Sequence, residues 1–549
     1  MKKLLFFVAA AAMMTACSTE ELANSGNNQD PNGDPINFSV YTPRSTTRAG
    51  VPVSIENTSL KTGDHKDYGF GIFGYYTAGT TYDQNAIPNF MWNQQVKWDA
   101  TASPAAWKYE PVKYWPNEYG NAAISDDIDY VSFFAYAPWT QFTPSSGLPI
   151  ITPIADYNTF ANKLGLPGVT SLATYKNYIK ATTDDAAKAA LDALNVDFIQ
   201  NKNITEISKN TATGDPIIKY VVDTNPAFSV DLLYGVAADN TSYSPINDVA
   251  GASAQNAAGK PFLNLVKPKV PATDKLNFYL QHALSKIKVT IDYIADAATP
   301  GGTSEDINPN YTRIYVRSIT FGGFAMKGAL NLNSTETMTV TTGTTPTDYT
   351  VGKPKWLSYD GTSELSINDI TFFDGRKDGR EGATNGAQNS ETPVGLNPNI
   401  VENEGLVVAG TTAIPLTHWA TAAEATTALA TEKTTGVTKT PQNVFGGVGD
   451  YFYVIPRNNN EPVNMTIVYD VETIDDNLAG KLSDNATYGS TIENVISKND
   501  IFSSGKDFMP GYTYHIKIHL GMTSVKVDAE VLAWTADNNA VVNLPDNQY

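Results

Sequence analysis

Residues 276–291, LNFYLQHALSKIKVTI, contain two runs in which apolar and polar side chains alternate. The apolar side chains at every second position are Leu276, Phe278, Leu280, Ile287, Val289 and Ile291. Successive side chains of a β-strand point to opposite faces of its sheet, whereas a helix repeats every 3.6 residues. This period of two therefore predicts two strands, each with one buried face.

Similar β-like runs recur along the chain and are separated by clusters of Gly, Pro, Asn and Asp. They cover residues 36–40, 68–76, 131–136, 217–222, 228–236 and 314–321. Many short strands with turn residues between them are typical of β-sandwich domains. The sequence therefore predicts an all-β, Tyr- and Asn-rich scaffold.

Composition limits the class of protein further. The chain has 549 residues, which is enough for two to four domains at roughly 100–200 residues each. Its net charge is −19, which makes sequence-independent binding to nucleic-acid phosphates unfavourable. The single cysteine excludes a disulfide framework and a zinc site built on several cysteines.

The N-terminus has the pattern of an export signal. Two lysines precede an apolar run at residues 4–14, which is too short for a membrane span of about 20 residues. Small residues then lead to Ala16 and to Cys17, the only cysteine of the chain. This arrangement resembles a bacterial lipobox, so we expect residues 1–16 to be a signal peptide and Cys17 to carry acyl chains.

Residues 17–50 are expected to connect this lipid anchor to the folded part of the chain. Residues 22–35 are Asn, Gly, Asp and Pro-rich, a composition that favours a flexible tether. A short alternating strand follows, with Ile36, Phe38 and Val40 on one face. The polar stretch after it contains Arg44 and Arg48, and exposed polar segments are favoured sites of proteolytic cleavage.

Prolines at positions 268 and 271 interrupt the strand pattern and predict a domain boundary. We expect one β-sandwich at residues 51–270 and a second at 271–549. Four stretches depart from the strand pattern: helical insertions at about 155–200 and 419–432, a loop at 375–400, and a C-terminal tail at about 536–549.

The sequence offers little catalytic or metal-binding chemistry, and we expect no enzymatic activity, no cofactor and no metal site. His515 and His519 lie in an alternating strand, where about 13 Å would separate them, too far to share an ion. His282 is expected to be a hydrogen-bonded structural histidine. The aromatic string at residues 107–115 is expected to be buried core, although exposed rings of this kind could stack on sugars.

A set of aromatic motifs occurs in a characteristic order behind the lipobox. They lie at residues 107–116, 131–138, 231–234, 278–287, 451–456 and 510–516, with Trp534 after them. Together they resemble the fimbrillin (type V pilin) family of Gram-negative surface lipoproteins. The chain is longer than a typical stalk fimbrillin, and its insertions favour an accessory or tip-like subunit.

The resemblance implies two transthyretin-like or Greek-key β-sandwich domains on an outer-membrane lipoprotein bearing acyl chains such as palmitate on Cys17. It also implies that an arginine-specific protease cuts the precursor, here between Arg48 and Ala49, with Arg44 as the second choice. The strand with Ile36, Phe38 and Val40 would then leave, and a strand of another fimbrial subunit would replace it.

The C-terminal tail could supply such a donor strand through Val541, Val542 and Leu544, or it could be a frayed terminus. The resemblance implies partners that are other fimbrial subunits and a receptor on a host or bacterial surface. Two other readings stay open at this point. One is a surface glycan-binding lipoprotein of a polysaccharide-uptake system, and the other is a hydrolase with converging carboxylates.

Overall fold

The structure is a computed structural model in which twenty segments of the chain are described. They are residues 35–41, 60–61, 68–116, 130–150, 203–222, 230–237, 259–265, 275–293, 312–342, 347–361, 368–374, 400–401, 405–409, 442–444, 451–457, 462–474, 489–502, 508–521, 525–533 and 541–542.

The first half of the chain builds an eight-stranded sheet, here called the N-terminal sheet. Its order is β1-β10-β8-β5-β2-β3-β4, and β9 also pairs with β5. The strands are β1 (Phe38–Tyr41), β2 (Phe70–Ala78), β3 (Met91–Asp99), β4 (Ala106–Lys108), β5 (Tyr130–Ala137), β8 (Leu233–Ala237), β9 (Phe262–Leu265) and β10 (Leu276–His282). Its pairs are antiparallel except for β1 and β10, which run parallel.

Both faces of the N-terminal sheet are covered, as the central strand β5 shows. All eight of its residues are buried. Phe133 belongs to one apolar cluster, which also contains the side chains of β1. Phe134, next in sequence, points to the opposite face and belongs to a second cluster. A strand buried on both faces needs a continuous apolar run, which explains the sequence of residues 130–137.

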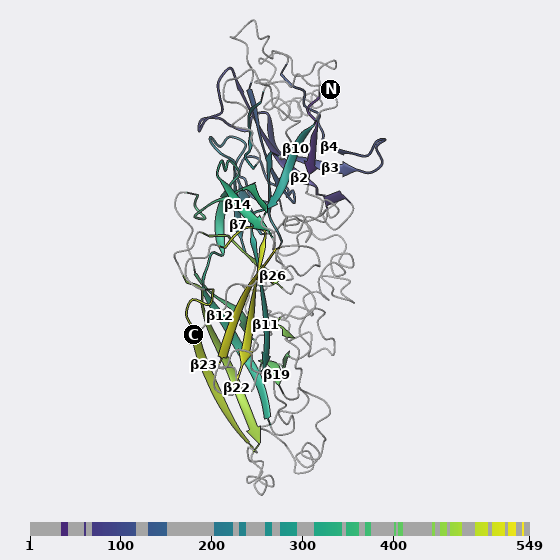
Figure 1. Cartoon of the computed structure of the whole chain (residues 1–549). Helices are drawn as coiled ribbons and strands as arrows, with labels where there is room; N and C mark the ends of the chain where they lie inside the picture. The colour runs from purple at the N-terminus through teal and green to yellow at the C-terminus, as the bar shows by residue number, and fades with distance from the viewer. Residues whose placement is uncertain are drawn as a thin grey trace, which may run out of the picture.

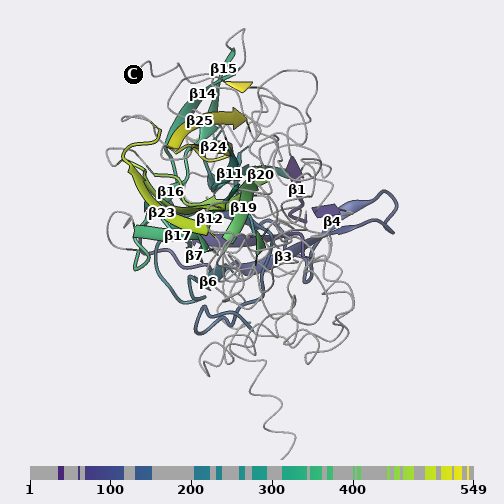
Figure 2. The ribbon, with the colours of Figure 1, turned by 90° about the horizontal axis from the view of Figure 1, so that it is seen from below.

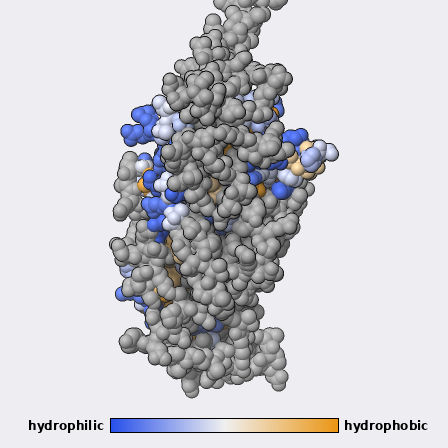
Figure 3. All heavy atoms as spheres, turned by 45° about the horizontal axis from the view of Figure 1, so that its top comes forward, coloured by the Kyte–Doolittle hydropathy of each residue, from blue (hydrophilic) through white to orange (hydrophobic). Residues whose placement is uncertain are grey.

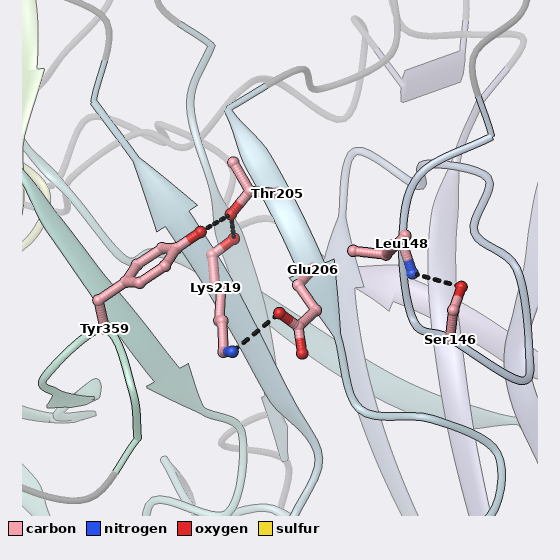
Figure 4. Close-up of polar contacts among 6 residues, drawn as sticks. All are labelled: Ser146, Leu148, Thr205, Glu206, Lys219 and Tyr359. Carbon is pink, nitrogen blue, oxygen red and sulfur yellow. Dashed lines mark hydrogen bonds and ion pairs between the residues drawn. The ribbon is translucent and has the colours of Figure 1, made fainter.

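A four-stranded sheet, here called the bridging sheet, packs on the outer face of the N-terminal sheet. Its order is β16-β13-β7-β6. The strands are β6 (Ile204–Ile207), β7 (Ile217–Val221), β13 (Lys327–Asn331) and β16 (Lys355–Leu357). On its outer side, the ammonium of Lys219 lies 2.8 Å from the Glu206 carboxylate, and the hydroxyls of Thr205 and Tyr359 are 2.7 Å apart (Figure 4).

Two six-stranded sheets form the C-terminal part. One has the order β20-β11-β24-β25-β26, with β21 also on β11, and the other has the order β18-β19-β12-β22-β23, with β17 also on β12. The first contains β11 (Ser285–Tyr293), β20 (Gln442–Asn443), β21 (Tyr451–Val454), β24 (Tyr512–Leu520), β25 (Val525–Ala533) and β26 (Val541–Val542). The second contains β12 (Thr312–Phe324), β17 (Asn368–Asp374), β18 (Ile400–Val401), β19 (Gly405–Ala409), β22 (Asn464–Ile474) and β23 (Gly489–Lys498).

These two sheets share one buried core, as in a sandwich. Ile287 and Ile516 come from the first sheet, Ile319 and Ile467 come from the second, and all four are fully buried in the same cluster. A separate hairpin, β14 (Thr337–Thr342) with β15 (Thr347–Gly352), completes the described strands. The strands lie along an elongated molecule, with the N-terminal sheet at one end and β22 and β23 at the other (Figure 1).

The core of the sandwich continues into the bridging sheet and onto the outer face of the N-terminal sheet. One cluster contains Phe73 of β2, Tyr220 of β7, Leu330 of β13 and Ile518 of β24. The second cluster occupies only the inner face of the N-terminal sheet. The described parts of the chain therefore share apolar contacts along most of the molecule. Figure 2 shows the ribbon of the same strands from below.

The chain passes from the N-terminal sheet to the C-terminal sandwich after β10. Leu276–His282 pairs with β8 in the N-terminal sheet, whereas Ser285–Tyr293 belongs to the C-terminal sandwich. The two residues between them are fixed by hydrogen bonds: Ala283 N donates to Leu232 O, and Gly511 N donates to Leu284 O, each at 2.8 Å. The prolines of the expected domain boundary, at residues 268 and 271, lie outside the described residues, between β9 and β10 in sequence.

The all-β prediction is confirmed, and the alternating stretch at residues 276–291 forms β10 and β11 as expected. The expected helical insertions at about 155–200 and 419–432 lie outside the described residues, as does nearly all of the expected loop at 375–400. Within the described segments, no helix combines the length and the apolar character that a membrane crossing requires.

The predicted structural role of His282 is confirmed at the junction of the sheets. Its Nδ1 lies 2.7 Å from Oδ2 of Asp231, and both side chains are only 2% exposed. The other carboxylate oxygen of Asp231 accepts a hydrogen bond from Leu232 N at 2.8 Å. The pair therefore joins the end of β10 to the start of β8, next to the connection into β11.

We predict that His282→Ala lowers the free energy of unfolding by about 3 kcal/mol or more, because it leaves a buried carboxylate without its main partner. The matched control is His519→Ala. His519 makes a similar contact with Asp292, but these two side chains are 15% and 11% exposed, so water can still reach the carboxylate and a smaller loss is expected. Urea unfolding followed by tryptophan fluorescence measures both losses, and equal losses would contradict the prediction.

Candidate functional site: the groove that holds β1

The strand β1 lies at the edge of the N-terminal sheet, between β10 and the segment that follows β4. On one side it pairs with β10 in parallel, with Phe38 opposite Leu276 and Val40 opposite Phe278. On the other side Ile36 N donates to Lys113 O at 2.9 Å, and Pro35 forms an antiparallel bridge with Tyr114. The segment around Lys113 follows β4, the opposite edge strand, so β1 is held between the two ends of a curved sheet.

The three apolar side chains expected to share a face do so, and all are buried. The exposed fraction is 0% for Ile36, 2% for Phe38 and 5% for Val40. Burial of an aliphatic or phenyl side chain contributes about 1.5–3 kcal/mol, so each of the three adds to the attachment of β1. They belong to the inner cluster of the N-terminal sheet, and β1 is thus part of its core.

Aromatic rings surround Phe38, the first residue of β1 and the middle one of the three buried side chains. The ring of Phe38 lies 5.4 Å from the rings of Tyr109 and Phe133 and 6.3 Å from that of Phe278, measured between centroids. The contact with Phe133 is edge-to-face, with an angle of 75° between the ring planes. This geometry is favoured between aromatic rings.

The hydroxyl of Tyr109 ties β1 to the wall of the groove. It donates to Ile36 O at 2.8 Å and accepts from Lys113 N at 3.1 Å. Burial raises the pKa of this hydroxyl, which therefore stays a donor over the ordinary pH range. Burial also lowers the pKa of the Lys113 ammonium, whose Nζ lies 5.9 Å from the ring centre of Phe90.

Polar side chains alternate with the buried ones along β1. The hydroxyl of Ser39 donates to the side-chain oxygen of Asn277 on β10, and the amide of Asn37 donates to Pro35 O at 3.4 Å. The backbone is bound as well, because Leu276 N donates to Asn37 O at 2.8 Å. The groove thus recognises an extended strand with apolar side chains inward and polar ones outward.

The other expected site residues are only partly described. Val541 and Val542 form β26, which pairs with Leu532 and Val531 of β25 at the edge of its sheet. The remaining ones lie outside the described residues: Ala16, Cys17, Arg44, Arg48, Ala49 and Leu544. In sequence, Arg44 and Arg48 follow the last residue of β1 within a few positions.

The structure also shows the surroundings of the two histidines and of the aromatic string for which no catalytic or metal-binding role was expected. His515 and His519 lie in β24, which confirms the strand, and their ring nitrogens bond Thr290 and Asp292 of β11 separately, at 2.8 and 2.5 Å. Trp107, Tyr109 and Trp115 of the aromatic string are buried, as expected, and they pack against the cluster that contains β1.

The sequence indicated β1 but not the residues that receive it. Tyr109 and Lys113 carry the contacts to Ile36, and Phe133 and Phe278 surround Phe38. Each of these was visible only as part of an aromatic or alternating run. No local signal could join Ile36 to Lys113, because strand pairing between distant segments depends on the complete sheet.

Comparison with known proteins gives structural neighbours only. No protein-family model matches the sequence, and no curated protein matches it. A fimbrial protein from Bacteroides vulgatus has 16% identity and a TM-score of 0.43, over 91% of this chain and 99% of that one. A candidate cell adhesion protein from Bacteroides uniformis has 12% identity and a TM-score of 0.28, over 85% and 91% of the two chains.

A third neighbour is the tip fimbrial protein Mfa3 from Porphyromonas gingivalis. It has 10% identity and a TM-score of 0.17, with 86% of this chain and 96% of that chain covered. The three neighbours are thus two fimbrial proteins and one candidate cell adhesion protein.

We predict that Phe38→Ala lowers the free energy of unfolding by about 3–5 kcal/mol, because it leaves a cavity lined by rings. Ser39→Ala is the control, since it changes the neighbouring outward side chain and removes one hydrogen bond, at a cost of about 1 kcal/mol. Urea unfolding of the two variants measures the difference. A loss for Phe38→Ala that does not exceed the control would contradict the packing described for β1.

Proposed function

We propose that this chain is the precursor of a subunit of a cell-surface fimbria, accessory or tip-like in position, which supports adhesion and has no enzymatic activity. One observation carries the proposal: a short terminal strand, β1, fills an apolar groove and is followed in sequence by arginines. Cleavage after one of these arginines would separate β1 from the rest of the fold.

Loss of β1 would leave two kinds of unsatisfied surface. The backbone groups of β10 that face β1 would lose their partners, and Lys113 O would lose the hydrogen bond from Ile36 N. The pockets of Ile36, Phe38 and Val40 would open to water. An extended strand from another subunit restores both, because its backbone continues the sheet and its alternate side chains fill the pockets. Assembly by donor-strand exchange follows from this requirement.

The proposal includes the route to the cell surface. Residues 1–16 would be removed as a signal peptide, and acyl chains on Cys17 would hold the precursor on the outer membrane, since each buried CH₂ contributes about 0.8 kcal/mol. An arginine-specific protease would then cut between Arg48 and Ala49, with Arg44 as the second choice. The mature chain would join other fimbrial subunits and present its surface to a receptor.

The glycan-binding alternative predicts a platform of exposed aromatic rings. The aromatic string that suggested one contributes Trp107, Tyr109 and Trp115 to the buried core. Figure 3 shows one face of the molecule, on which the coloured, described residues include hydrophilic and hydrophobic ones. The burial of the aromatic string favours the fimbrial proposal over a glycan-binding lipoprotein.

We predict that brief trypsin treatment of the chain from Ser18 onward removes the segment before Ala49, as intact mass would show. The cut protein should exchange β1 slowly for an added labelled peptide of residues 34–42, because the old strand must leave before a new one can enter the groove. The double variant Arg44→Gln, Arg48→Gln should stay uncut at this point and should not take up the peptide. Uptake of the peptide to the same extent by the uncut variant would contradict strand exchange.

A further inference from the structure

We propose that the β1 groove selects a donor strand with an aromatic side chain at its central position and aliphatic side chains two residues to either side. This pattern excludes the C-terminal tail of a second copy and requires a different subunit as donor. The inference rests on the proposed strand exchange and adds the chemistry of the partner.

The central pocket is built for a ring. Phe38 is 2% exposed, and rings on three sides contact it: Tyr109 at 5.4 Å, Phe133 at 5.4 Å and Phe278 at 6.3 Å. Phe133 lies in β5, Phe278 in β10 and Tyr109 directly after β4, so three separate segments would have to move to close the pocket around a smaller side chain. Cavities that the surroundings cannot fill are costly. A ring at this position is therefore required for tight binding.

The outer positions take smaller, aliphatic side chains. Ile36 is completely buried next to the Tyr109 hydroxyl, which bonds its carbonyl oxygen at 2.8 Å. Val40 is 5% exposed and lies opposite Phe278 in the strand register. Between them, Asn37 and Ser39 are polar and point outward. The groove thus accepts an aliphatic, an aromatic and a second aliphatic side chain at alternate residues of the bound strand.

The tail of this chain does not present that series. With Val542 at the centre, the outer positions are Ala540 and Leu544, and the ring pocket holds only a valine. With Val541 at the centre, both outer positions are asparagines, and with Leu544 at the centre one of them is Asp546. Burying an unpaired polar or charged side chain is more costly than leaving a cavity.

The tail also has a place in its own fold. Val541 and Val542 pair with Leu532 and Val531 at the edge strand β25. A tail that leaves this pairing would lose these contacts before it gained any in a neighbouring groove. Both observations point to a donor from a different subunit.

The test uses the full-length chain in detergent, cut by trypsin and mixed with an excess of fluorescein-labelled peptides. Four peptides form two matched pairs. Residues 34–42 of the chain are compared with the same peptide carrying Phe38→Val, and residues 538–546 are compared with the same tail peptide carrying Val542→Phe. Fluorescence anisotropy at equilibrium gives the dissociation constant of each, and circular dichroism checks that the cut protein keeps its fold.

We expect the 34–42 peptide to bind and the Phe38→Val change to weaken binding about 30-fold or more, through the lost ring contacts. The tail peptide should bind about 100-fold more weakly than the 34–42 peptide, and Val542→Phe should recover at least about tenfold. A gain in affinity from this single added ring would show that the pocket selects a ring, because nonspecific binding of the peptides would not depend on one position.

Two different results would overturn the inference. If the tail peptide binds as tightly as the 34–42 peptide and Val542→Phe has no effect, selectivity for a ring is wrong while strand exchange stands. If no peptide binds to a cut protein that keeps its fold, strand exchange itself fails, and the inference fails with it.

Discussion

The N-terminal sheet has to bury apolar side chains on both of its faces, and this requirement determines how the rest of the molecule is arranged. Its central strand β5 has no exposed residue. The outer face is covered by the bridging sheet, whose core continues into the C-terminal sandwich. The inner face is covered by the curved sheet itself, by the segment after β4 and by β1. Of these, only β1 is a short strand that precedes the other strands of the sheet in sequence.

The connection between the two ends of the molecule follows from the same requirement. A single short link, Ala283 and Leu284, leads from β10 to β11, and it is fixed by backbone bonds to both neighbouring sheets. The indole of Trp356 in the bridging sheet donates to Ala283 O at 2.9 Å and adds a third contact. Together with the buried pair of His282 and Asp231, these bonds favour a stiff junction over a flexible linker.

The sequence predicted the strands well because their periodicity is local. The alternation at residues 276–291 predicted β10 and β11, and the apolar run at residues 131–136 predicted β5. It did not predict that β10 and β11 belong to different sheets, because an alternating pattern says which face is buried but not what covers it. Prolines 268 and 271 indicated a break in the chain, and that break separates two strands of one sheet.

The candidate site shows the same division between local and distant information. Ile36, Phe38 and Val40 were recognisable as one buried face, whereas Tyr109 and Lys113 gave no sign that they would bind this strand. Cation–π contacts were equally hidden: Lys61 Nζ lies 4.2 Å from the ring centre of Trp98, from a part of the chain with no strand pattern. Such pairs depend on how the sheet curves, and this curvature cannot be predicted from the spacing of side chains along one strand.

The parallel pairing of β1 with β10 has a consequence for the order of folding. Ser39 and Asn277 are 238 residues apart in sequence, which makes this one of the most distant contacts among the described residues. Because synthesis proceeds from the N-terminus, β1 is present long before its partner strand. The groove becomes complete only when β10 arrives, and at that moment β1 is already tethered nearby at a high effective concentration. Closure within the chain is then favoured over capture of a strand from a neighbouring chain.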